Sequence, residues 1–416
     1  MAETPSHIVV IGAGIIGVCA ALELRRRGHA VTIIDREGPA SACSFGNAGL
    51  FAEAAFQPLA TPDALMKVPG WLIRDNGPIA VQWRYLPSLA PWLMRYLVSA
   101  FKPDMAERGD AIHALTINST ARYEKLAAEA GVPELAQRTE YVYAFRDPAA
   151  LAHKQDLTES YRAKGYTVDM VSATELCALE PDLDTAHVGG AVLRNMGFTP
   201  NPGRLTKAIY ELFLREGGQS KTATVQGFEA KPEGGVRFVH TSEGGVACDG
   251  VVLAAGAWSA RLLAPLGVKV PLETERGYHV LVRNPGVTVA RPIYGGEGSM
   301  VATPMEEGLR FAGTVEFASV DAAPNPARIE NILRTARALF PTLNTADHDV
   351  WMGCRPTLPD SLPVIDRCPG HANVALAFGH QHLGLTCAPA TAHLVADVVD
   401  GRQSNIDIAP YRATRF

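Results

Sequence analysis

Cysteine is scarce in this sequence of 416 residues, and neither sign of charge is in large excess. The seven cysteines are dispersed, with no C-x-x-C pair and no zinc-type spacing. This pattern disfavours a disulfide framework or a metal site and favours reduced thiols in a cytoplasmic protein. The 38 basic and 43 acidic residues give a formal net charge of −5 without a basic stripe, so we expect no nucleic-acid partner.

Long apolar runs are also missing. No stretch approaches about 18 uncharged apolar residues, so no transmembrane helix is expected. The chain enters a predicted strand at once, which leaves no room for a signal peptide. What the sequence does contain is 47% hydrophobic and 19% charged residues, as in ordinary well-packed proteins, and its length predicts two or three domains.

One amphipathic, aromatic segment at residues 77–103 stands apart from this pattern. We interpret it as two helices, broken by Pro87 and Pro91, that pack on the body of the protein. An alternative is a helix that lies at a membrane surface, which would place the protein peripherally at the inner membrane.

The first residues carry a dinucleotide-binding signature. An apolar strand at residues 7–11 runs into G-x-G-x-x-G; a helical pattern and a second strand follow, and that strand ends in Asp35. Gly12 suits the tight turn, Gly14 lets the backbone approach a pyrophosphate, and Gly17 lets the helix pack closely on the strand. Asp35 is placed to accept hydrogen bonds from ribose hydroxyls. The complete unit predicts a bound dinucleotide.

FAD is favoured over NAD by the segment that follows. Residues 41–51, SACSFGNAGLF, are small, glycine-rich and apolar, and they include Asn47, Ala48 and Gly49. Bare backbone of this kind can lie against a flat ring and hydrogen-bond its edge. The chain offers no second G-x-G-x-x-G, which disfavours an enzyme that holds both FAD and NADPH.

Near the C-terminus an apolar strand runs into Gly379-His380-Gln381-His382-Leu383-Gly384, and a long helix follows. A helix N-terminus favours negative charge, such as that which develops at the pyrimidine edge of a reduced flavin. A metal pair formed by His380 and His382 is disfavoured because no acid or cysteine nearby completes a ligand set.

The motifs GAGIIG, SFGNAG, LAAGAWS, GCRPTLPD and GHQHLGLT together resemble the FAD-dependent D-amino acid oxidase superfamily, and within it the bacterial D-amino acid dehydrogenases and their glycine-oxidase-like relatives. The resemblance runs from about residue 7 to about residue 401. It implies an α/β fold, with a Rossmann-type FAD-binding domain and a threaded α+β substrate-binding domain of mixed sheet plus helices. We assign residues 1–55, 200–268 and 350–416 to the first domain, and residues 56–199 and 269–349 to the second.

The motifs and the resemblance together give a set of candidate FAD contacts. These are Gly12, Gly14, Ile16, Gly17, Asp35, Arg36, Ser44, Asn47, Ala48, Gly49, Ala255, Gly256, Gly379, His380, Gly384, Leu385 and Thr386. The related sarcosine-type oxidases attach FAD through a cysteine in a loop comparable to that of Cys354. The Cys-Arg-Pro sequence here is closer to that of the dehydrogenases, so we expect FAD to be bound non-covalently.

Arg355 stands between a Gly-Cys pair and a proline, among apolar residues. This setting suits a guanidinium that holds an anion in a desolvated pocket, and the resemblance implies that the anion is the α-carboxylate of the substrate. The alternative is that Arg355 pairs with Asp360 or Asp366 and pins the loop.

Two further residues are candidate substrate contacts. Tyr278 and His279 alternate across a predicted strand, so only one can face the flavin. The resemblance favours Tyr278, with packing in the core as its alternative role. His382 replaces the smaller residue expected in the dehydrogenases, and we expect it to face the substrate.

The resemblance implies oxidation of the Cα–N bond of a D-amino acid in amino acid catabolism, with hydride transfer to the flavin. The imine product then hydrolyses to a 2-oxo acid; a cyclic imino acid such as D-proline or hydroxy-D-proline would give a cyclic imine. The expected electron acceptor is a quinone or oxygen. Two alternatives stay open: a glycine, sarcosine or secondary-amine oxidase, and a flavin subunit of a larger electron-transfer complex.

Overall fold

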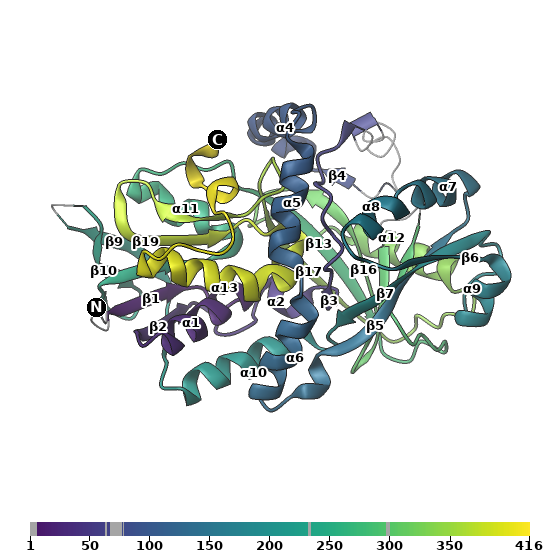
Figure 1. Cartoon of the computed structure of the whole chain (residues 1–416), viewed down its shortest axis with the longest axis horizontal. Helices are drawn as coiled ribbons and strands as arrows, with labels where there is room; N and C mark the ends of the chain where they lie inside the picture. The colour runs from purple at the N-terminus through teal and green to yellow at the C-terminus, as the bar shows by residue number, and fades with distance from the viewer. Residues whose placement is uncertain (1–5, 63–64, 67–76, 78, 232–233, 297–299) are drawn as a thin grey trace.

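A computed structural model describes residues 6–62, 65–66, 77, 79–231, 234–296 and 300–416. Two sheets organise these residues (Figure 1). A six-stranded sheet with its helices occupies the half of the molecule that holds the N-terminus, and a larger sheet occupies the other half. This mixed α/β architecture confirms the fold class predicted from the sequence.

The six-stranded sheet has the order β18-β19-β12-β1-β2-β8 and is parallel except for the β18–β19 pair. Its central strands β1, β12 and β19 are short, largely apolar and largely buried, as expected for a parallel sheet covered on both faces. Their bounds are β1 His7–Ile11, β2 Ala30–Asp35, β8 Gln219–Thr222, β12 Gly250–Leu253, β18 Val364–Cys368 and β19 His371–Phe378.

Helices cover one face of this sheet, and a small antiparallel sheet covers the other. The helices are α1 (Ile15–Arg26), α10 (Pro202–Arg215) and α13 (Gly384–Asp400), and the small sheet consists of β9 (Val225–Ala230), β10 (Val236–Thr241) and β11 (Val246–Ala247). The Asn201 side chain caps α10 by accepting a hydrogen bond of 2.9 Å from the Arg204 N–H. Helix α13 ends at Gly401, whose φ of 68° suits a glycine C-cap.

The second sheet has ten strands, in the order β17-β13-β16-β15-β14-β5-β7-β3, with β4 on β16 and β6 on β7. Helix α12 (Pro326–Leu339) packs on β13, β15 and β16. The strands are β3 Leu50–Phe51, β4 Ile79–Val81, β5 Gln137–Phe145, β6 Val168–Ser172, β7 Gly189–Phe198, β13 Glu273–Val282, β14 Ile293–Gly295, β15 Met300–Met305, β16 Gly308–Phe317 and β17 His348–Thr357.

The remaining helices are short or connect the two halves. They are α2 Cys43–Gly46, α4 Leu86–Ala100, α5 Met105–Thr116, α6 Ser119–Glu129, α7 Pro148–Asp156, α8 Thr158–Ala163, α9 Ala173–Leu179 and α11 Ser259–Leu263. The 3-10 turns are η1 Trp83–Tyr85, η2 Pro133–Leu135, η3 Gly256–Trp258, η4 Ala264–Leu266, η5 Gln381–Leu383, η6 Ala409–Tyr411 and η7 Ala413–Arg415. No helix in the described ranges is both long and apolar enough to cross a membrane.

The division into two domains stays a prediction, but the sheets do not follow its boundaries everywhere. Strands β3 and β17 pair within the ten-stranded sheet, although the prediction placed them in the FAD-binding segments. Residues 1–5, 63–64, 67–76, 78, 232–233 and 297–299 of the predicted segments lie outside the described residues.

Helices α5 and α6 belong to the core beside α13 rather than to the ten-stranded sheet. The Tyr123 hydroxyl of α6 donates a hydrogen bond of 2.6 Å to the Leu385 carbonyl. The Ser119 hydroxyl donates one of 2.9 Å to the Thr386 carbonyl. Residues from the predicted substrate-binding segments therefore hold the first turn of a helix that belongs to the FAD-binding segments.

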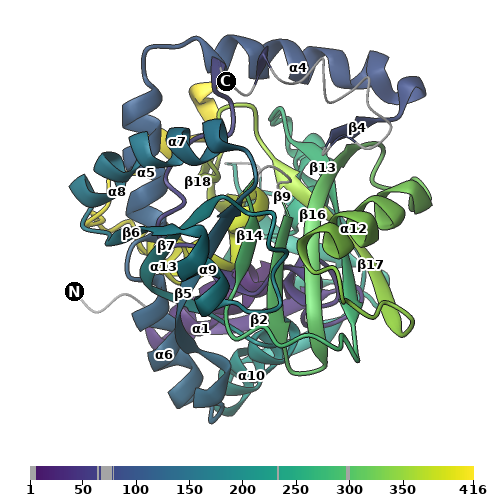
Figure 2. The same cartoon turned by 90° about the vertical axis from the view of Figure 1, so that its right-hand side faces the viewer.

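The amphipathic segment contains β4, η1 and one helix, α4, that includes both Pro87 and Pro91, so the predicted break at the two prolines is wrong. Pro87 lies in the first turn of α4, where its missing N–H costs nothing, and Pro91 removes only the hydrogen bond to the carbonyl four residues earlier. Residue 78 of the segment lies outside the described residues. Figure 2 shows α4 along one edge of the molecule, near β4.

Candidate active site

A cavity of about 1380 Å³ connects the two halves of the molecule. On one side it is lined by the loops that follow β1, β2, β12 and β19, which leave the six-stranded sheet at its carboxyl edge. On the other side it is lined by β13 and β17. The carboxyl edge of a parallel sheet is where such folds bind dinucleotides.

The first turn of the cavity wall can be built only with glycine. Gly12 has φ of 110°, and a Cβ there would lie 2.4 Å from the Ala254 carbonyl oxygen. A Cβ on Gly17 would lie 1.9 Å from the Gly12 carbonyl oxygen. Helix α1 begins just beyond this turn, and its Ile15 N–H donates a hydrogen bond of 2.8 Å to the Ser44 hydroxyl. This helix N-terminus favours an anion such as a pyrophosphate.

Asp35 stands at the end of β2 and organises the next loop. Its carboxylate accepts hydrogen bonds from the N–H groups of Ala13 at 2.8 Å, Glu37 at 2.9 Å and Gly38 at 3.0 Å. Its Oδ1 accepts two of these bonds and its Oδ2 only one, so Oδ2 still has a lone pair for a ribose hydroxyl. The Arg36 guanidinium lies over the Trp258 ring at 4.1 Å, which adds a flat wall beside this acid.

The Asn47 side chain holds its own loop instead of pointing into the cavity. Its amide nitrogen donates to the carbonyls of Cys43 at 3.1 Å and Ser44 at 3.3 Å, and its amide oxygen accepts from the Gly49 N–H at 2.9 Å. The loop therefore presents mainly backbone to the cavity, together with the small side chain of Ala48.

Most of the predicted FAD contacts line this one cavity. They are Gly12, Gly14, Ile16, Asp35, Arg36, Ser44, Asn47, Ala48, Ala255, Gly256, His380, Gly384 and Leu385. Their predicted contact with FAD is consistent with this placement and stays a prediction.

Four predicted contacts, Gly17, Gly49, Gly379 and Thr386, are not among the lining residues and support the wall from behind. Gly49 and Gly379 have φ of 74° and 87°, and Cβ atoms there would lie within 2.4 Å and 2.5 Å of other residues. The Thr386 hydroxyl accepts a hydrogen bond of 3.0 Å from the Ala52 N–H. These positions shape the backbone that faces the cavity.

Arg355 lies in the cavity wall on β17, directly opposite Glu275 of β13. Its guanidinium rests on Gly277, where a Cβ would lie 2.4 Å from the Arg355 Cζ. Within the described part of the chain, Arg355 takes part in no ion pair or hydrogen bond.

The acids of the alternative interpretation of Arg355 have other partners. Asp360 pairs with Arg415 at 2.6 Å, and Asp366 accepts from the Ala413 N–H at 2.9 Å. The Arg355 guanidinium is thus left available to an anion in the cavity.

Tyr278 and His279 alternate as expected, and of the two it is Tyr278 that is among the residues lining the cavity. The Tyr278 hydroxyl donates a hydrogen bond of 2.5 Å to Glu316 and accepts one of 3.0 Å from the Asn325 N–H. Although Tyr278 borders the cavity, its hydroxyl lies on the side where α12 packs. His279 lies on the other face, 2.8 Å from the Gly46 carbonyl. The contact of Tyr278 with the substrate therefore stays a prediction, and the hydrogen bond of its hydroxyl to the buried Glu316 supports the alternative role in core packing.

His382 reaches the cavity, as expected of a residue that faces the substrate. Its side chain is exposed to the space of the cavity. Desolvation by the surrounding protein, and then the charge of Arg355, lower the pKa of His382 to about 4. Burial likewise lowers the pKa of His380 to about 3, and its Nε2 lies 3.0 Å from the Thr391 hydroxyl. Both rings are neutral at neutral pH.

The Cys354 thiol, considered above for covalent attachment, is directed at the Val320 carbonyl, 3.9 Å away. Burial raises the pKa of this thiol, which disfavours the reactive thiolate. The structure thus offers no feature that favours a covalent link.

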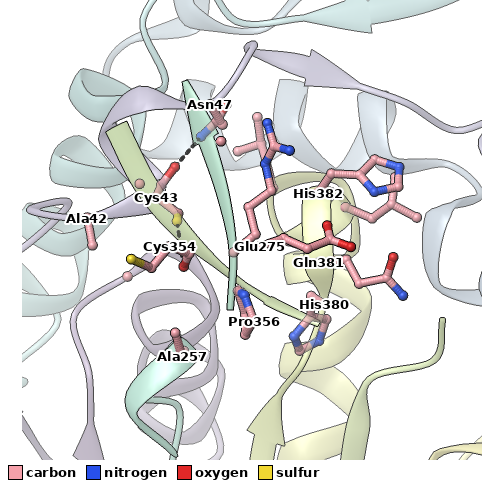
Figure 3. A pocket seen from close by; sticks show the side chains of 18 of the residues that line it. Ala42, Cys43, Asn47, Ala257, Glu275, Cys354, Pro356, His380, Gln381 and His382 are labelled. Carbon is pink, nitrogen blue, oxygen red and sulfur yellow. Dashed lines mark hydrogen bonds between the residues drawn. The ribbon is translucent and has the colours of Figure 1, made fainter. Parts of the chain in front are cut away.

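The sequence analysis missed several residues of the wall, chiefly Glu275, Gln381 and Trp351. Figure 3 shows the Glu275 carboxylate directed toward the segment that carries Gln381 and His382. The sequence did contain a signal for Glu275, because residues two apart in a strand lie on the same face, and Glu275 is two residues before Gly277 and four before His279. The pairing with β17 was needed to bring that face to Arg355.

The residues of this cavity fit FAD. The glycine turn leaves no room for a Cβ, the N-terminus of α1 would hold the pyrophosphate, and Asp35 would hold the ribose. The loop 41–51 and the first turn of α13 would hold the flavin ring.

Comparison with known proteins agrees with this chemistry. A family described as FAD dependent oxidoreductase matches residues 7–398. The chain is 38% identical over 418 residues to a D-amino-acid oxidase of Bradyrhizobium diazoefficiens, with 99% of both proteins covered. It is 32% identical to a D-amino acid dehydrogenase of Paramagnetospirillum magneticum, with 98% of both covered. Its fold matches that of glycine oxidase from Geobacillus kaustophilus with a TM-score of 0.77 at 21% identity, over 100% of both chains. The chain therefore belongs to the FAD dependent oxidoreductase family, and its cofactor is FAD.

Proposed function

We propose that this protein oxidises the Cα–N bond of a D-amino acid, open-chain or cyclic, to an imine that hydrolyses to a 2-oxo acid. The observation that carries the proposal is the unpaired guanidinium of Arg355 in the wall of the FAD cavity. Relatives named as a D-amino-acid oxidase and a D-amino acid dehydrogenase support it.

Arg355 holds the substrate carboxylate through two parallel hydrogen bonds, a geometry that the planar guanidinium provides. Gly277 allows this guanidinium to lie flat on β13, which fixes its orientation. Bound FAD supplies the acceptor for the hydride that leaves Cα. The rings of His380 and His382 are neutral at neutral pH, so neither adds to the positive charge that Arg355 presents.

The substrate side chain has an aromatic surface available. Phe317 pairs with Glu275 across β13 and β16, and Trp92 packs on Phe317 and stacks on Tyr96. All three rings line the cavity. An apolar side chain or a pyrrolidine ring would bury its surface there, which favours such substrates over small polar ones.

The test is anaerobic bleaching of the flavin by D- and L-amino acids, glycine, sarcosine, D-proline and hydroxy-D-proline. We expect D-amino acids or D-imino acids to bleach wild type, and Arg355→Ala to retain FAD but lose this reaction. Arg283→Ala is the matched control, because Arg283 follows β13 and makes only exposed ion pairs. Bleaching by glycine or sarcosine alone would replace the proposal with the alternative oxidase. If the purified chain alone oxidises an amino acid with a dye as electron acceptor, the protein does not need a larger electron-transfer complex for activity, and that alternative is excluded.

For the electron acceptor, we propose a quinone reached by peripheral contact of α4 with a membrane. Trp83, Val98 and Phe101 are 70%, 58% and 71% exposed, next to the exposed bases Arg84 and Lys102. Other residues of the same helix line the cavity, so the apolar surface leads toward the flavin site. Apolar residues flanked by basic ones favour an anionic membrane surface.

Co-sedimentation with vesicles that contain anionic lipid tests this contact. We expect wild type to bind and the double variant Trp83→Gln, Phe101→Gln to stay in solution with its FAD content unchanged. Equal sedimentation of both proteins, or none of wild type, would contradict the membrane contact and leave oxygen as the expected acceptor.

A further inference from the structure

Glu275 is a buried acid in the cavity wall that the proposed function does not yet use. It is 6% exposed, and it takes part in no ion pair with any described residue. A buried carboxylate without a cationic partner is costly, and such groups are found where a ligand or a reaction uses them.

Glu275 and Arg355 present opposite charges to the same space. They are directly opposite in the antiparallel pair β13–β17, and side chains in this relation have Cβ atoms about 4.5–5.5 Å apart. The guanidinium nevertheless lies over Gly277 and does not contact the carboxylate. The wall therefore offers two separate binding groups a few ångströms apart: Arg355 for an anion and Glu275 for a cation.

An α-amino acid carries the complementary pair of charges, since its carboxylate and its ammonium group are bonded to the same carbon. We propose that Glu275 binds the substrate's ammonium group and accepts its proton, while Arg355 holds the carboxylate. This inference rests on the proposed function and adds a catalytic residue to it.

In the proton-transfer step an N–H bond of the ammonium group breaks and an O–H bond forms on the Glu275 carboxylate. The amine becomes neutral, and its nitrogen lone pair can then assist the departure of hydride from Cα to the cofactor. Glu275 becomes a neutral acid, which its buried position favours.

The surroundings of Glu275 suit this role. Burial raises the pKa of its carboxyl above the ordinary value, against the opposing effects of the Arg355 charge and of Thr357. The other ionisable groups that face it are Tyr96 of α4 and His382, whose ring is neutral at neutral pH. Arg36 and Arg261 also line the cavity, but Arg355 is the one described cation whose charge affects the pKa of Glu275.

Two probes that differ only in the amine separate this role from a structural one. D-alanine carries both charges, and propionate carries the carboxylate alone. For Glu275→Gln, which keeps the shape of the side chain, we expect the apparent Kd of D-alanine in anaerobic stopped-flow to rise about 10-fold or more, as for the loss of a hydrogen bond to a charged group. The Kd of propionate, from its perturbation of the flavin spectrum, should stay unchanged or fall.

Glu273→Gln is the matched control. Glu273 lies on the same face of β13 but accepts its hydrogen bond from the Tyr85 hydroxyl at 2.8 Å, and it does not line the cavity. This variant should bind both probes as wild type does. Glu275→Asp should recover part of the preference for D-alanine over propionate, which excludes a folding defect as the cause.

Equal changes for the two probes in Glu275→Gln, or no change for D-alanine, would overturn the role of Glu275. Failure of the proposed function looks different, because then no amino acid bleaches the flavin of wild type. In that case Arg355→Ala and Glu275→Gln would both leave D-alanine binding as it is in wild type.

Discussion

The Trp351 ring of β17 lies directly against the backbone of Gly46 in α2. A Cβ on Gly46 would lie 2.2 Å from Trp351 Cδ2, so the two elements touch without space for a methyl group. The His279 ring stacks on the same indole, with ring centroids 5.2 Å apart. The strand that carries Arg355 is thereby fixed to the loop that carries the candidate flavin contacts.

Gly46→Ala should weaken the contact between β17 and α2. The methyl group must displace the indole or α2, and overpacking of this kind costs about 1–3 kcal/mol of stability. We expect a lower Tm and a lower FAD content after purification. Gly227→Ala is the control, since a Cβ there meets nothing within 4 Å. Full FAD content and an unchanged Tm in Gly46→Ala would show that the contact is dispensable.

Gly277→Ala should act on the substrate and not on the cofactor. Its Cβ would lie 2.4 Å from the Arg355 Cζ, so the guanidinium must leave its place on β13. We expect kcat/KM for the best amino acid to fall about 10-fold or more, as for a lost bidentate carboxylate contact, with FAD content unchanged. Wild-type kinetics in this variant would contradict the position assigned to Arg355.

Tyr278→Phe separates the role that the structure gives this residue from the predicted substrate contact. Loss of the hydroxyl leaves the fully buried Glu316 and the Asn325 N–H each without one hydrogen bond, which costs about 1–3 kcal/mol of stability. We expect a lower Tm with KM unchanged. A raised KM at unchanged Tm would restore the substrate contact.

The rate of flavin reduction should depend on the ionisation of Glu275. Its carboxylate must be ionised to accept the ammonium proton, so the rate should fall as the pH drops through the pKa of Glu275. Because burial raises this pKa, the fall should begin above the ordinary pKa of 4.5. Glu275→Gln should lose this acid limb, and an identical pH profile in both proteins would count against the assignment.

Glu23 of α1 should contribute stability that is lost in acid. A hydrogen bond with His393, opposed by burial, and the charges of His393 and Arg27 lower its pKa from 4.5 to about 2. Since the folded-state pKa is the lower one, the contribution is complete above pH 4.5 and disappears as the pH falls toward about 2. Glu23→Gln should lower the free energy of unfolding by about 1–3 kcal/mol at pH 6. The difference from wild type, measured by urea unfolding, should shrink over that pH range; a constant difference would contradict the linkage.

Local signals in the sequence were enough for the nucleotide-binding half. The glycine turn and Asp35 each depend on neighbours within a few residues, and the structure has the turn and the acid where they were predicted. The strand that carries Tyr278 and His279 was predicted as well, because alternation along a strand is also a local property.

The arrangement of the candidate substrate site could not be predicted from local sequence patterns. The pairing of Glu275 with Arg355 joins positions far apart in the chain, and no local pattern sets that register. Alternation showed that Tyr278 and His279 face opposite ways, but the packing of α12 decides which way. Proline preferences predicted a break in α4, and packing of Leu89 and Trp92 on Phe317 favours one helix instead.

The hydrogen bonds that hold the first turn of α13 should affect the rate at which the cofactor dissociates. The hydroxyls of Tyr123 and Ser119 bind the carbonyls of Leu385 and Thr386, and the Ala52 N–H binds the Thr386 hydroxyl. The turn that would hold the flavin edge is therefore tied to both halves of the molecule at once. Neither half can swing away from a bound flavin without breaking hydrogen bonds of the buried core. The residence time of the cofactor should accordingly follow the unfolding rate of the whole chain rather than the opening of a local gate.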